Sequence, residues 1–350
     1  MHKDDLMTPK ERAAAMSRGE PFDRLPAFPF LSVVGPKIAG ITLREMRNDP
    51  CKEAFFMTEC YRLLGNDSLI EDYGLHGIGI ALGSETDDPE NAVPSITKFV
   101  LDDLKKVDSL DMSKIERRND PEFAKRYQAA EIMLEEVGDE VGVDVSVCGP
   151  FTAAASICST EKVLYAVRKD PENLHKLIRF CTDAIKMICH DFFTLGLSFT
   201  LCDPIASGTI LKRQDYLDFA EPYTREIVSD LHGIGASVSY HICGNTSSII
   251  DAMVGTGIET LSVDNLVDLA WAKEQAGSKV CIAGNVDPVG VMMLGTPDDV
   301  DLAVKTCIEK GRDSPCGYIV ATGCDIPYAA PEENVFKFME AVRKYGKIKN

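Results

Sequence analysis

The chain has 350 residues, of which 45% are hydrophobic and 26% are charged, so it can bury a large globular core. Its formal net charge of −18 argues against a nucleic-acid or anionic-membrane partner, because both require basic surfaces. This length suits either one barrel-sized domain with an insertion or two smaller domains.

The N-terminus shows no positively charged segment followed by an apolar run, and no stretch approaches about 18 consecutive apolar residues. We therefore expect neither secretion nor a membrane span, and a cytoplasmic location. The 12 cysteines are then expected to be thiols or metal ligands rather than disulfides, and an anaerobic host would suit them.

Short runs rich in β-branched residues alternate with amphipathic helical stretches along most of the chain. Candidate strands lie near 25–33 and 68–73, and then at 143–147, 197–201, 238–242, 259–263, 279–283 and 318–321. Helices that open at or next to a proline are predicted at about 170–195, 296–312 and 331–345. Strands alternating with helices imply an α/β protein with a parallel sheet, and eight strands close a (β/α)8 TIM barrel.

One stretch interrupts this alternation. Residues 84–138 are richer in charge and poorer in β-branched runs, so we expect a mostly helical insertion there. A doubly wound sheet is the rival architecture. No Gly-x-Gly-x-x-Gly motif follows a first strand to support its nucleotide-binding version.

Three residues at predicted strand ends form a candidate catalytic metal site. His241 and Cys243 are two apart on a strand, so their side chains point to the same side, and Cys324 follows the last predicted strand. Three protein ligands leave a fourth position open, as in catalytic zinc sites. The alternative is that both cysteines pack as ordinary small apolar residues.

Four further polar residues at strand ends are candidates for substrate binding: Asp203, Asn245, Asp264 and Asn285. Asp203 is also a candidate for a fourth metal ligand or for a hydrogen bond to His241. For all four residues the alternative is a local role in turn formation, which is common for Asp and Asn.

Several motifs together resemble the uroporphyrinogen decarboxylase superfamily over nearly the whole chain. They are Gly149-Pro150-Phe151-Thr152, Asp203-Pro204, Ala220-Glu221-Pro222-Tyr223, Gly284-Asn285-Val286-Asp287-Pro288 and Gly323-Cys324-Asp325-Ile326-Pro327. The resemblance implies a single TIM-barrel domain over residues 1–350. Within the superfamily, His-x-Cys followed much later by Cys is most similar to the zinc-dependent methylcobamide:coenzyme M methyltransferases.

The sequence differs from the decarboxylases at positions that would bind a highly charged substrate. Those enzymes hold a polyanionic tetrapyrrole with an arginine-bearing segment near the N-terminus, whereas the stretch 26–35 here has no arginine. They also place Gly-His-Gly where Gly323-Cys324-Asp325 stands. A substrate with many carboxylates needs cationic donors, so decarboxylation of a porphyrinogen is disfavoured.

The resemblance implies a zinc-dependent methyltransferase that moves a methyl group between a corrinoid protein and a small acceptor such as a coenzyme M-like thiol. The cofactors would be Zn²⁺ and a methyl-cobamide carried by the partner, because the chain has no Asp-x-His-x-x-Gly corrinoid motif. Alternatives are demethylation of a methoxylated or methylamine-type donor, a narrower decarboxylase, and a non-catalytic module that binds a corrinoid protein. The sequence leaves open the direction of transfer and whether the chain forms a homodimer.

Overall fold

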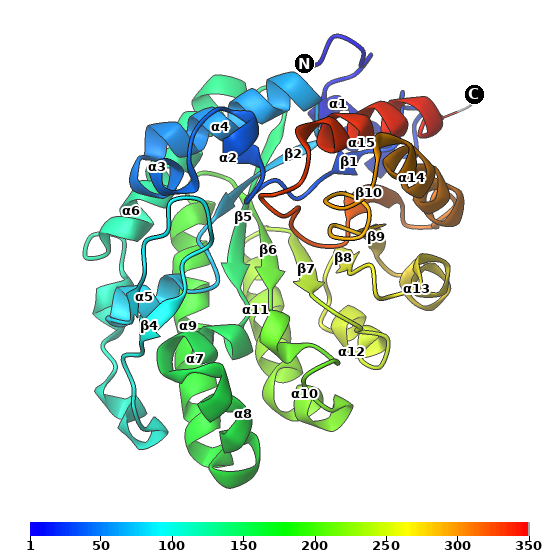
Figure 1. The fold of residues 1–350 in the computed structure, drawn as a ribbon. Coiled ribbons are helices and arrows are strands. Elements are labelled where there is room, and N and C mark those ends of the chain that lie inside the picture. The colour runs from blue at the N-terminus through cyan, green and yellow to red at the C-terminus, as the bar shows by residue number, and fades with distance from the viewer. Residues whose placement is uncertain (349–350) are drawn as a thin grey trace.

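The computed structural model describes residues 1–348 and shows a ring of parallel strands surrounded by helices (Figure 1). Within these residues eight strands pair in the order β1-β10-β9-β8-β7-β6-β5-β2, and all of these pairs are parallel. The strands are β1 (Ala27–Phe28), β2 (Ser68–Asp72), β5 (Gly142–Cys148), β6 (Ser198–Cys202), β7 (Val238–Ile242), β8 (Thr260–Val263), β9 (Cys281–Val286) and β10 (Tyr318–Thr322). This arrangement confirms the predicted (β/α)8 TIM barrel.

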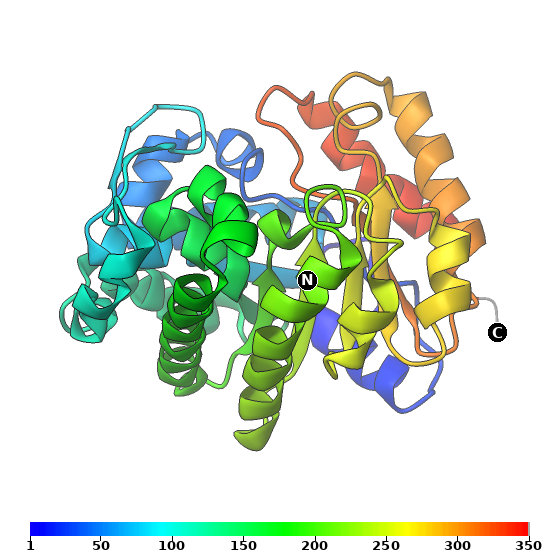
Figure 2. The same ribbon diagram turned by 90° about the horizontal axis from the view of Figure 1, so that it is seen from below.

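The helices form an outer layer around the strands, as the view from below shows (Figure 2). They are α1 (Pro9–Ser17), α2 (Gly35–Ile38), α3 (Leu43–Asn48), α4 (Pro50–Leu64), α5 (Gly77–Leu82), α6 (Pro121–Val137), α7 (Pro150–Cys158), α8 (Thr160–Lys169), α9 (Pro171–Phe193), α10 (Arg213–Phe219), α11 (Glu221–Gly233), α12 (Ile250–Gly255), α13 (Leu269–Ala276), α14 (Pro297–Gly311) and α15 (Glu332–Tyr345). In α9, Leu174, Ile178 and Ile185 recur at helical spacing and are fully buried, which explains its packing on the barrel. In residues 1–348, no helix combines the length and apolar character needed to cross a membrane.

The first strand is shorter than the sequence predicts. A strand is expected over 25–33, but the structure forms only β1 there. Pro26 and Pro29 flank it, and proline has no N–H to donate to a sheet ladder. Beyond β1 the chain passes to the mouth of the barrel, where Phe30 lines a cavity.

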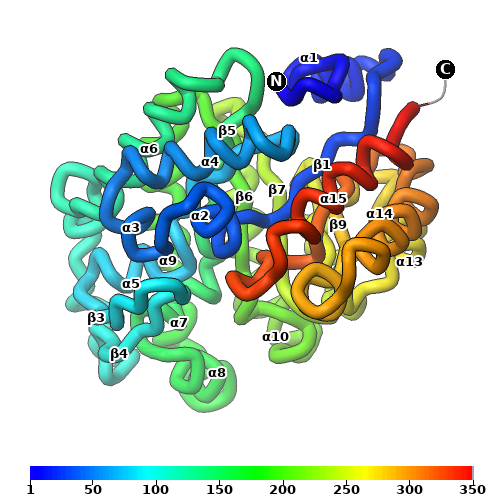
Figure 3. The backbone as a smooth tube through the Cα atoms, turned by 45° about the horizontal axis from the view of Figure 1, so that its top comes forward, coloured from blue at the N-terminus to red at the C-terminus, as the bar shows by residue number. Residues whose placement is uncertain are grey.

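The predicted insertion at 84–138 also differs in part from expectation. Its first half contains an antiparallel pair, β3 (Glu85–Thr86) and β4 (Ile96–Lys98), which lies beside α5 in Figures 1 and 3. Two 3₁₀ helices follow, η1 (Leu104–Ser109) and η2 (Met112–Ile115). Helix α6 packs against α4, β2 and β5, so it belongs to the helical layer of the barrel. A third 3₁₀ helix, η3 (Pro204–Ala206), follows β6.

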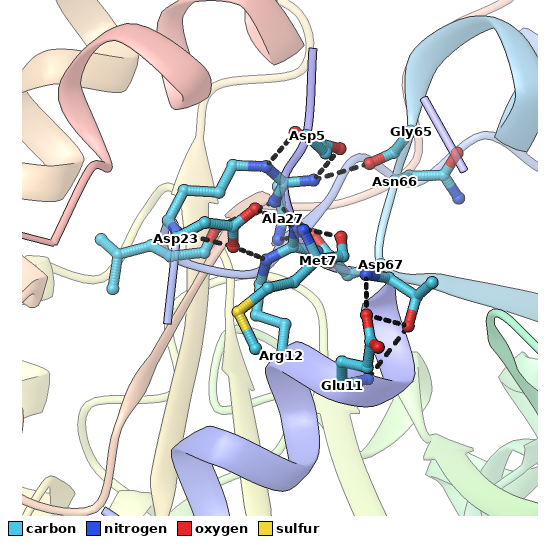
Figure 4. A network of polar contacts seen from close by, with 12 residues as sticks. Asp5, Met7, Glu11, Arg12, Asp23, Ala27, Gly65, Asn66 and Asp67 are labelled. Carbon is cyan, nitrogen blue, oxygen red and sulfur yellow. Dashed lines mark hydrogen bonds and ion pairs between the residues drawn. The ribbon is translucent and has the colours of Figure 1, made fainter. Parts of the chain in front are cut away.

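A buried polar network joins β1 to β2 and so closes the ring of strands (Figure 4). Asp67, directly before β2, donates its N–H to the carbonyl of Ala27 at 2.9 Å and accepts the Ala27 N–H on its carboxylate at 2.7 Å. The same carboxylate pairs with Arg12 of α1 and with Arg24, whose Nη1 lies 2.6 Å away. These side chains are all under 10% exposed. Charged residues that are far apart in the sequence therefore hold the base of the barrel together.

Candidate active site

His241, Cys243 and Cys324 meet at the carboxyl ends of β7 and β10. Nε2 of His241 lies 3.2 Å from Sγ of Cys243, and that sulfur lies 3.4 Å from Sγ of Cys324. One ligand atom from each residue falls within 4.8 Å of the others. Ligands about 2.3 Å from one tetrahedral ion lie about 3.8 Å apart, so this nitrogen and two sulfurs fit a shared Zn²⁺.

Two glycines allow the ligands to sit where they do. Gly244 follows Cys243 with φ of +82°, a left-handed conformation that other residues rarely adopt. A Cβ at this position would also lie 2.8 Å from Oγ of Ser207. Gly323 precedes Cys324, and a Cβ there would lie 2.5 Å from the backbone nitrogen of Asn265. A side chain at either glycine would therefore force a shift in the turn next to Cys243 or Cys324.

The histidine ring is held by a neighbouring strand. Nδ1 of His241 lies 3.0 Å from Oγ of Ser262, which is its register partner on β8. The ring is 3% exposed and lies 5.6 Å from that of Phe30. The contact with Ser262 leaves Nε2 directed at the sulfurs, as expected for a metal-binding histidine with an outer hydrogen-bond partner.

The two thiols influence one another's ionisation. Their mutual hydrogen bond is the largest cause that lowers the pKa of Cys324 and raises that of Cys243, and His241 further favours the Cys324 thiolate. Both cysteines are free thiols in this structure. The pair can therefore supply thiolate, which is the form of cysteine that binds zinc.

His241, Cys243 and Cys324 line a cavity of about 320 Å³ at the mouth of the barrel. Its apolar wall includes Phe30, Phe56, Met57 and Ile80. Val93, from the segment that connects β3 to β4, also lines the cavity. A cavity of this volume is large enough for a small molecule.

Carboxylates occupy one wall of the same cavity. Asp325 follows Cys324, Asp72 ends β2, and Glu53 projects from α4. Burial, and then the neighbouring Cys324 charge, raise the pKa of Asp325 to about 7. Burial is also the main cause of the raised pKa of Glu53, although the ion pair with Arg126 opposes it.

The residues predicted to bind substrate have contacts outside the cavity lining. The carboxylate of Asp203 accepts hydrogen bonds from the N–H and hydroxyl of Thr152 at 2.8 and 2.6 Å, at the start of α7. Burial raises the pKa of Asp203 to about 6. Its backbone N–H donates to the carbonyl of His241 at 3.0 Å, so it supports β7 through the main chain.

The other three residues of that set also make local contacts. Oδ2 of Asp264 accepts the N–H of Gly244 at 2.9 Å and so ties β8 to the turn after Cys243. Asn285 donates to the carbonyls of Asp264 and Val267, at 3.1 and 2.7 Å. Asn245 is exposed, and its side-chain oxygen accepts the N–H of Ser247.

Sequence reasoning missed several residues that line the cavity, and also Ser262, which contacts His241 from outside the lining. Asp72 lies at the end of a predicted strand and could have been found by the rule that selected Asp203. Ser262 lies two positions before Asp264 on a predicted strand. Glu53 and Arg126 lie within helices far apart in the sequence, and no spacing signal brings them together.

Comparison with known proteins gives the family. A model described as "Uroporphyrinogen decarboxylase (URO-D)" matches residues 8–345. The chain belongs to this family. A methylcobamide:CoM methyltransferase of Methanosarcina mazei is 29% identical and aligns with 97% of this chain and 98% of its own length. A uroporphyrinogen decarboxylase of Thermosynechococcus vestitus is 30% identical over 58% of this chain and 60% of its own length.

A solved methyltransferase structure from Methanosarcina mazei matches the fold with a TM-score of 0.85. It is 24% identical and covers 97% of this chain and 99% of the solved chain. The resemblance drawn from the motifs is thus confirmed, both for the URO-D family and for full-length similarity to methylcobamide:CoM methyltransferases.

Proposed function

We propose that the chain is a zinc-dependent methyltransferase that transfers a methyl group from a methyl-corrinoid protein to a small thiol. The observation that carries this proposal is the convergence of one nitrogen and two sulfurs, from His241, Cys243 and Cys324, at the edge of a small cavity. The full-length similarity to a methylcobamide:CoM methyltransferase supports the corrinoid chemistry.

Zn²⁺ held by these three residues would keep an incoming substrate thiol as its thiolate, which is the nucleophile in methyl transfer. The substrate sulfur attacks the methyl carbon of the methyl-cob(III)amide. The sulfur–carbon bond forms as the carbon–cobalt bond breaks, and both electrons of the broken bond stay on cobalt as cob(I)amide. The thiol proton is released to solvent when the thiolate forms, and no proton moves at the transferred carbon.

The chain's own residues orient this reaction. Ser262 fixes the His241 ring, while the turns at Gly244 and Gly323 place the cysteines at the cavity. The apolar wall that includes Phe30 and Phe56 limits the access of water to the substrate sulfur. Exclusion of water preserves the nucleophilicity of a thiolate, because its hydration shell must otherwise be removed before attack.

A separate corrinoid protein is the proposed methyl carrier, and the mouth of the barrel is suited to receive it. Several exposed apolar side chains lie in loops that follow the carboxyl ends of barrel strands, the face on which TIM-barrel enzymes place their chemistry. These residues are Leu75, Ile210, Leu266, Val289 and Leu294. Exposed apolar residues gathered on one face are typical of a protein–protein interface.

The decisive experiment measures metal content and turnover together. Purified protein should hold about one zinc per chain by elemental analysis and should demethylate methylcobalamin in the presence of small thiols. Removal of the metal with a chelator should abolish turnover, and added Zn²⁺ should restore it. Full turnover by the metal-free protein would overturn the proposal, and so would release of carbon dioxide from uroporphyrinogen by that protein.

A further inference from the structure

We propose that the small-molecule substrate carries a cationic group, such as an ammonium, at the end remote from its sulfur. This inference rests on the proposed function, because it concerns the substrate of the same cavity. It derives from the ionisable side chains that line the cavity. It also derives from Glu71, a buried acid next to the lining residue Arg126.

The cavity has more carboxylates than cations. Its acidic lining residues are Glu53, Asp72, Glu122 and Asp325, whereas its arginines are Arg47 and Arg126. Oδ1 of Asp325 is buried without a hydrogen-bond partner among the described residues. An entering cation therefore finds more carboxyl acceptors on the lining than an entering anion finds cationic donors.

Arg126 is already shared between two buried carboxylates. Its Nη1 pairs with Glu53, and its Nε lies 4.0 Å from Oε1 of Glu71. Glu71 is fully buried, and within residues 1–348 both of its carboxylate oxygens lack a hydrogen-bond partner. Arg126 brings one positive charge to two acids, and burial together with the neighbouring Glu53 raises the pKa of Glu71 well above its ordinary value. Of these three residues Glu53 and Arg126 line the cavity, so a cation bound there would add the positive charge that this cluster lacks at Glu53.

The other arginine is also engaged. Nη2 of Arg47 lies 3.0 Å from Oδ1 of Asp88, and its Nη1 donates to the carbonyl of Ala92 at 3.1 Å. These bonds hold the segment that carries Val93 and Pro94 against the cavity. An anionic substrate such as a sulfonate would have to break these pairs to obtain a cationic partner, whereas an ammonium would not.

Three thioethers of equal length test this charge preference directly. They are 2-(methylthio)ethylammonium, 2-(methylthio)ethanol and 2-(methylthio)ethanesulfonate, which correspond to methylated products that differ only in the terminal group. Their binding to the zinc-loaded protein is measured by calorimetry, without any turnover. We expect the ammonium compound to bind at least tenfold more tightly than the alcohol, and the sulfonate to bind most weakly. A preference for the ammonium below tenfold, or no measurable ammonium binding, would overturn the proposal.

Variants locate the effect on the acidic wall. Glu53→Gln and Asp72→Asn should each reduce the ammonium preference at least threefold, while Glu135→Gln, an exposed position on the same helix as Arg126, should leave it unchanged. If Glu53→Gln does not fold, Asp72→Asn decides the question. A full preference in the folded variants would refute the assignment to this wall. Methyl transfer to the matching thiols is assayed separately: its failure with all three would refute the methyltransferase function, while the binding order would still decide the charge proposal.

Discussion

Oγ of Ser262 lies 3.0 Å from Nδ1 of His241, and the two residues are register partners on adjacent parallel strands. Both side chains are buried, at 5% and 3% exposure, so water does not compete readily for this contact. The hydroxyl therefore sets the rotation of the ring and keeps Nε2 directed at the cysteine sulfurs.

Replacement of Ser262 by alanine should weaken zinc binding while leaving the ligand set intact. We expect zinc affinity to fall by about 10- to 100-fold, the range seen when an outer hydrogen-bond partner of a metal ligand is removed. Competition with a chromophoric chelator measures this change, and circular dichroism checks the fold. Ser262→Thr keeps the hydroxyl and should restore most of the affinity. Equal zinc affinity in Ser262→Ala and the parent protein would show that Ser262 does not orient the ring.

Replacement of His241 or Cys324 should lower zinc binding more than replacement of Ser262. His241→Ala and Cys324→Ser should each lose bound zinc and methyl transfer together, because two remaining ligands hold the ion poorly. Elemental analysis and methylcobalamin turnover are measured on the same samples. Cys316→Ser, at an exposed cysteine, serves as the matched control and should keep both properties. Retention of zinc by both ligand variants would place the metal elsewhere.

The convergence of His241, Cys243 and Cys324 could be predicted from sequence because strand periodicity and turn signals are local. His241 and Cys243 are two apart on a strand, and Cys324 follows another strand, so the parallel barrel brings all three to the same edge. The pattern of strands and helices likewise predicted the barrel. Each of these inferences depends on residues that are close in the chain or on one rule of topology.

The acidic wall could not be predicted in this way. Glu53 and Arg126 are 73 positions apart on two helices, and their pairing depends on how α4 and α6 pack. Asp203 shows a false positive of the sequence reasoning. Its position after a strand marks it as a candidate for substrate or metal binding, but its carboxylate accepts a hydrogen bond from Thr152. The shortness of β1 followed from its flanking prolines, which the hydrophobic pattern alone did not weigh.

Acid should destabilise the protein through the network at the base of the barrel. Burial alone would raise the pKa of Asp5, but hydrogen bonds from Arg24 and Arg343 outweigh it and lower the pKa to about 2, from an ordinary value of 3.8. The pKa in the folded state is below that in the unfolded state, so this stabilisation is present above pH of about 4 and is lost as the pH falls towards 2. Urea midpoints measured from pH 5 to 2.5 should decline, and Asp5→Asn should decline less steeply than the parent. Identical slopes would exclude a contribution from Asp5.

Closure of the barrel should depend on Asp67. Its carboxylate accepts the N–H of Ala27 at 2.7 Å and pairs with Arg12 and Arg24, both nearly fully buried. Asp67→Asn keeps the shape but leaves two buried guanidinium groups short of one negative charge, and breaking a buried pair costs about 3–5 kcal/mol. We expect the free energy of unfolding in urea to fall by about that amount. Glu20→Gln removes an exposed carboxylate paired with Arg18 and should leave the free energy of unfolding nearly unchanged. If Asp67→Asn changed the free energy of unfolding as little as Glu20→Gln does, the strand contacts alone would close the ring.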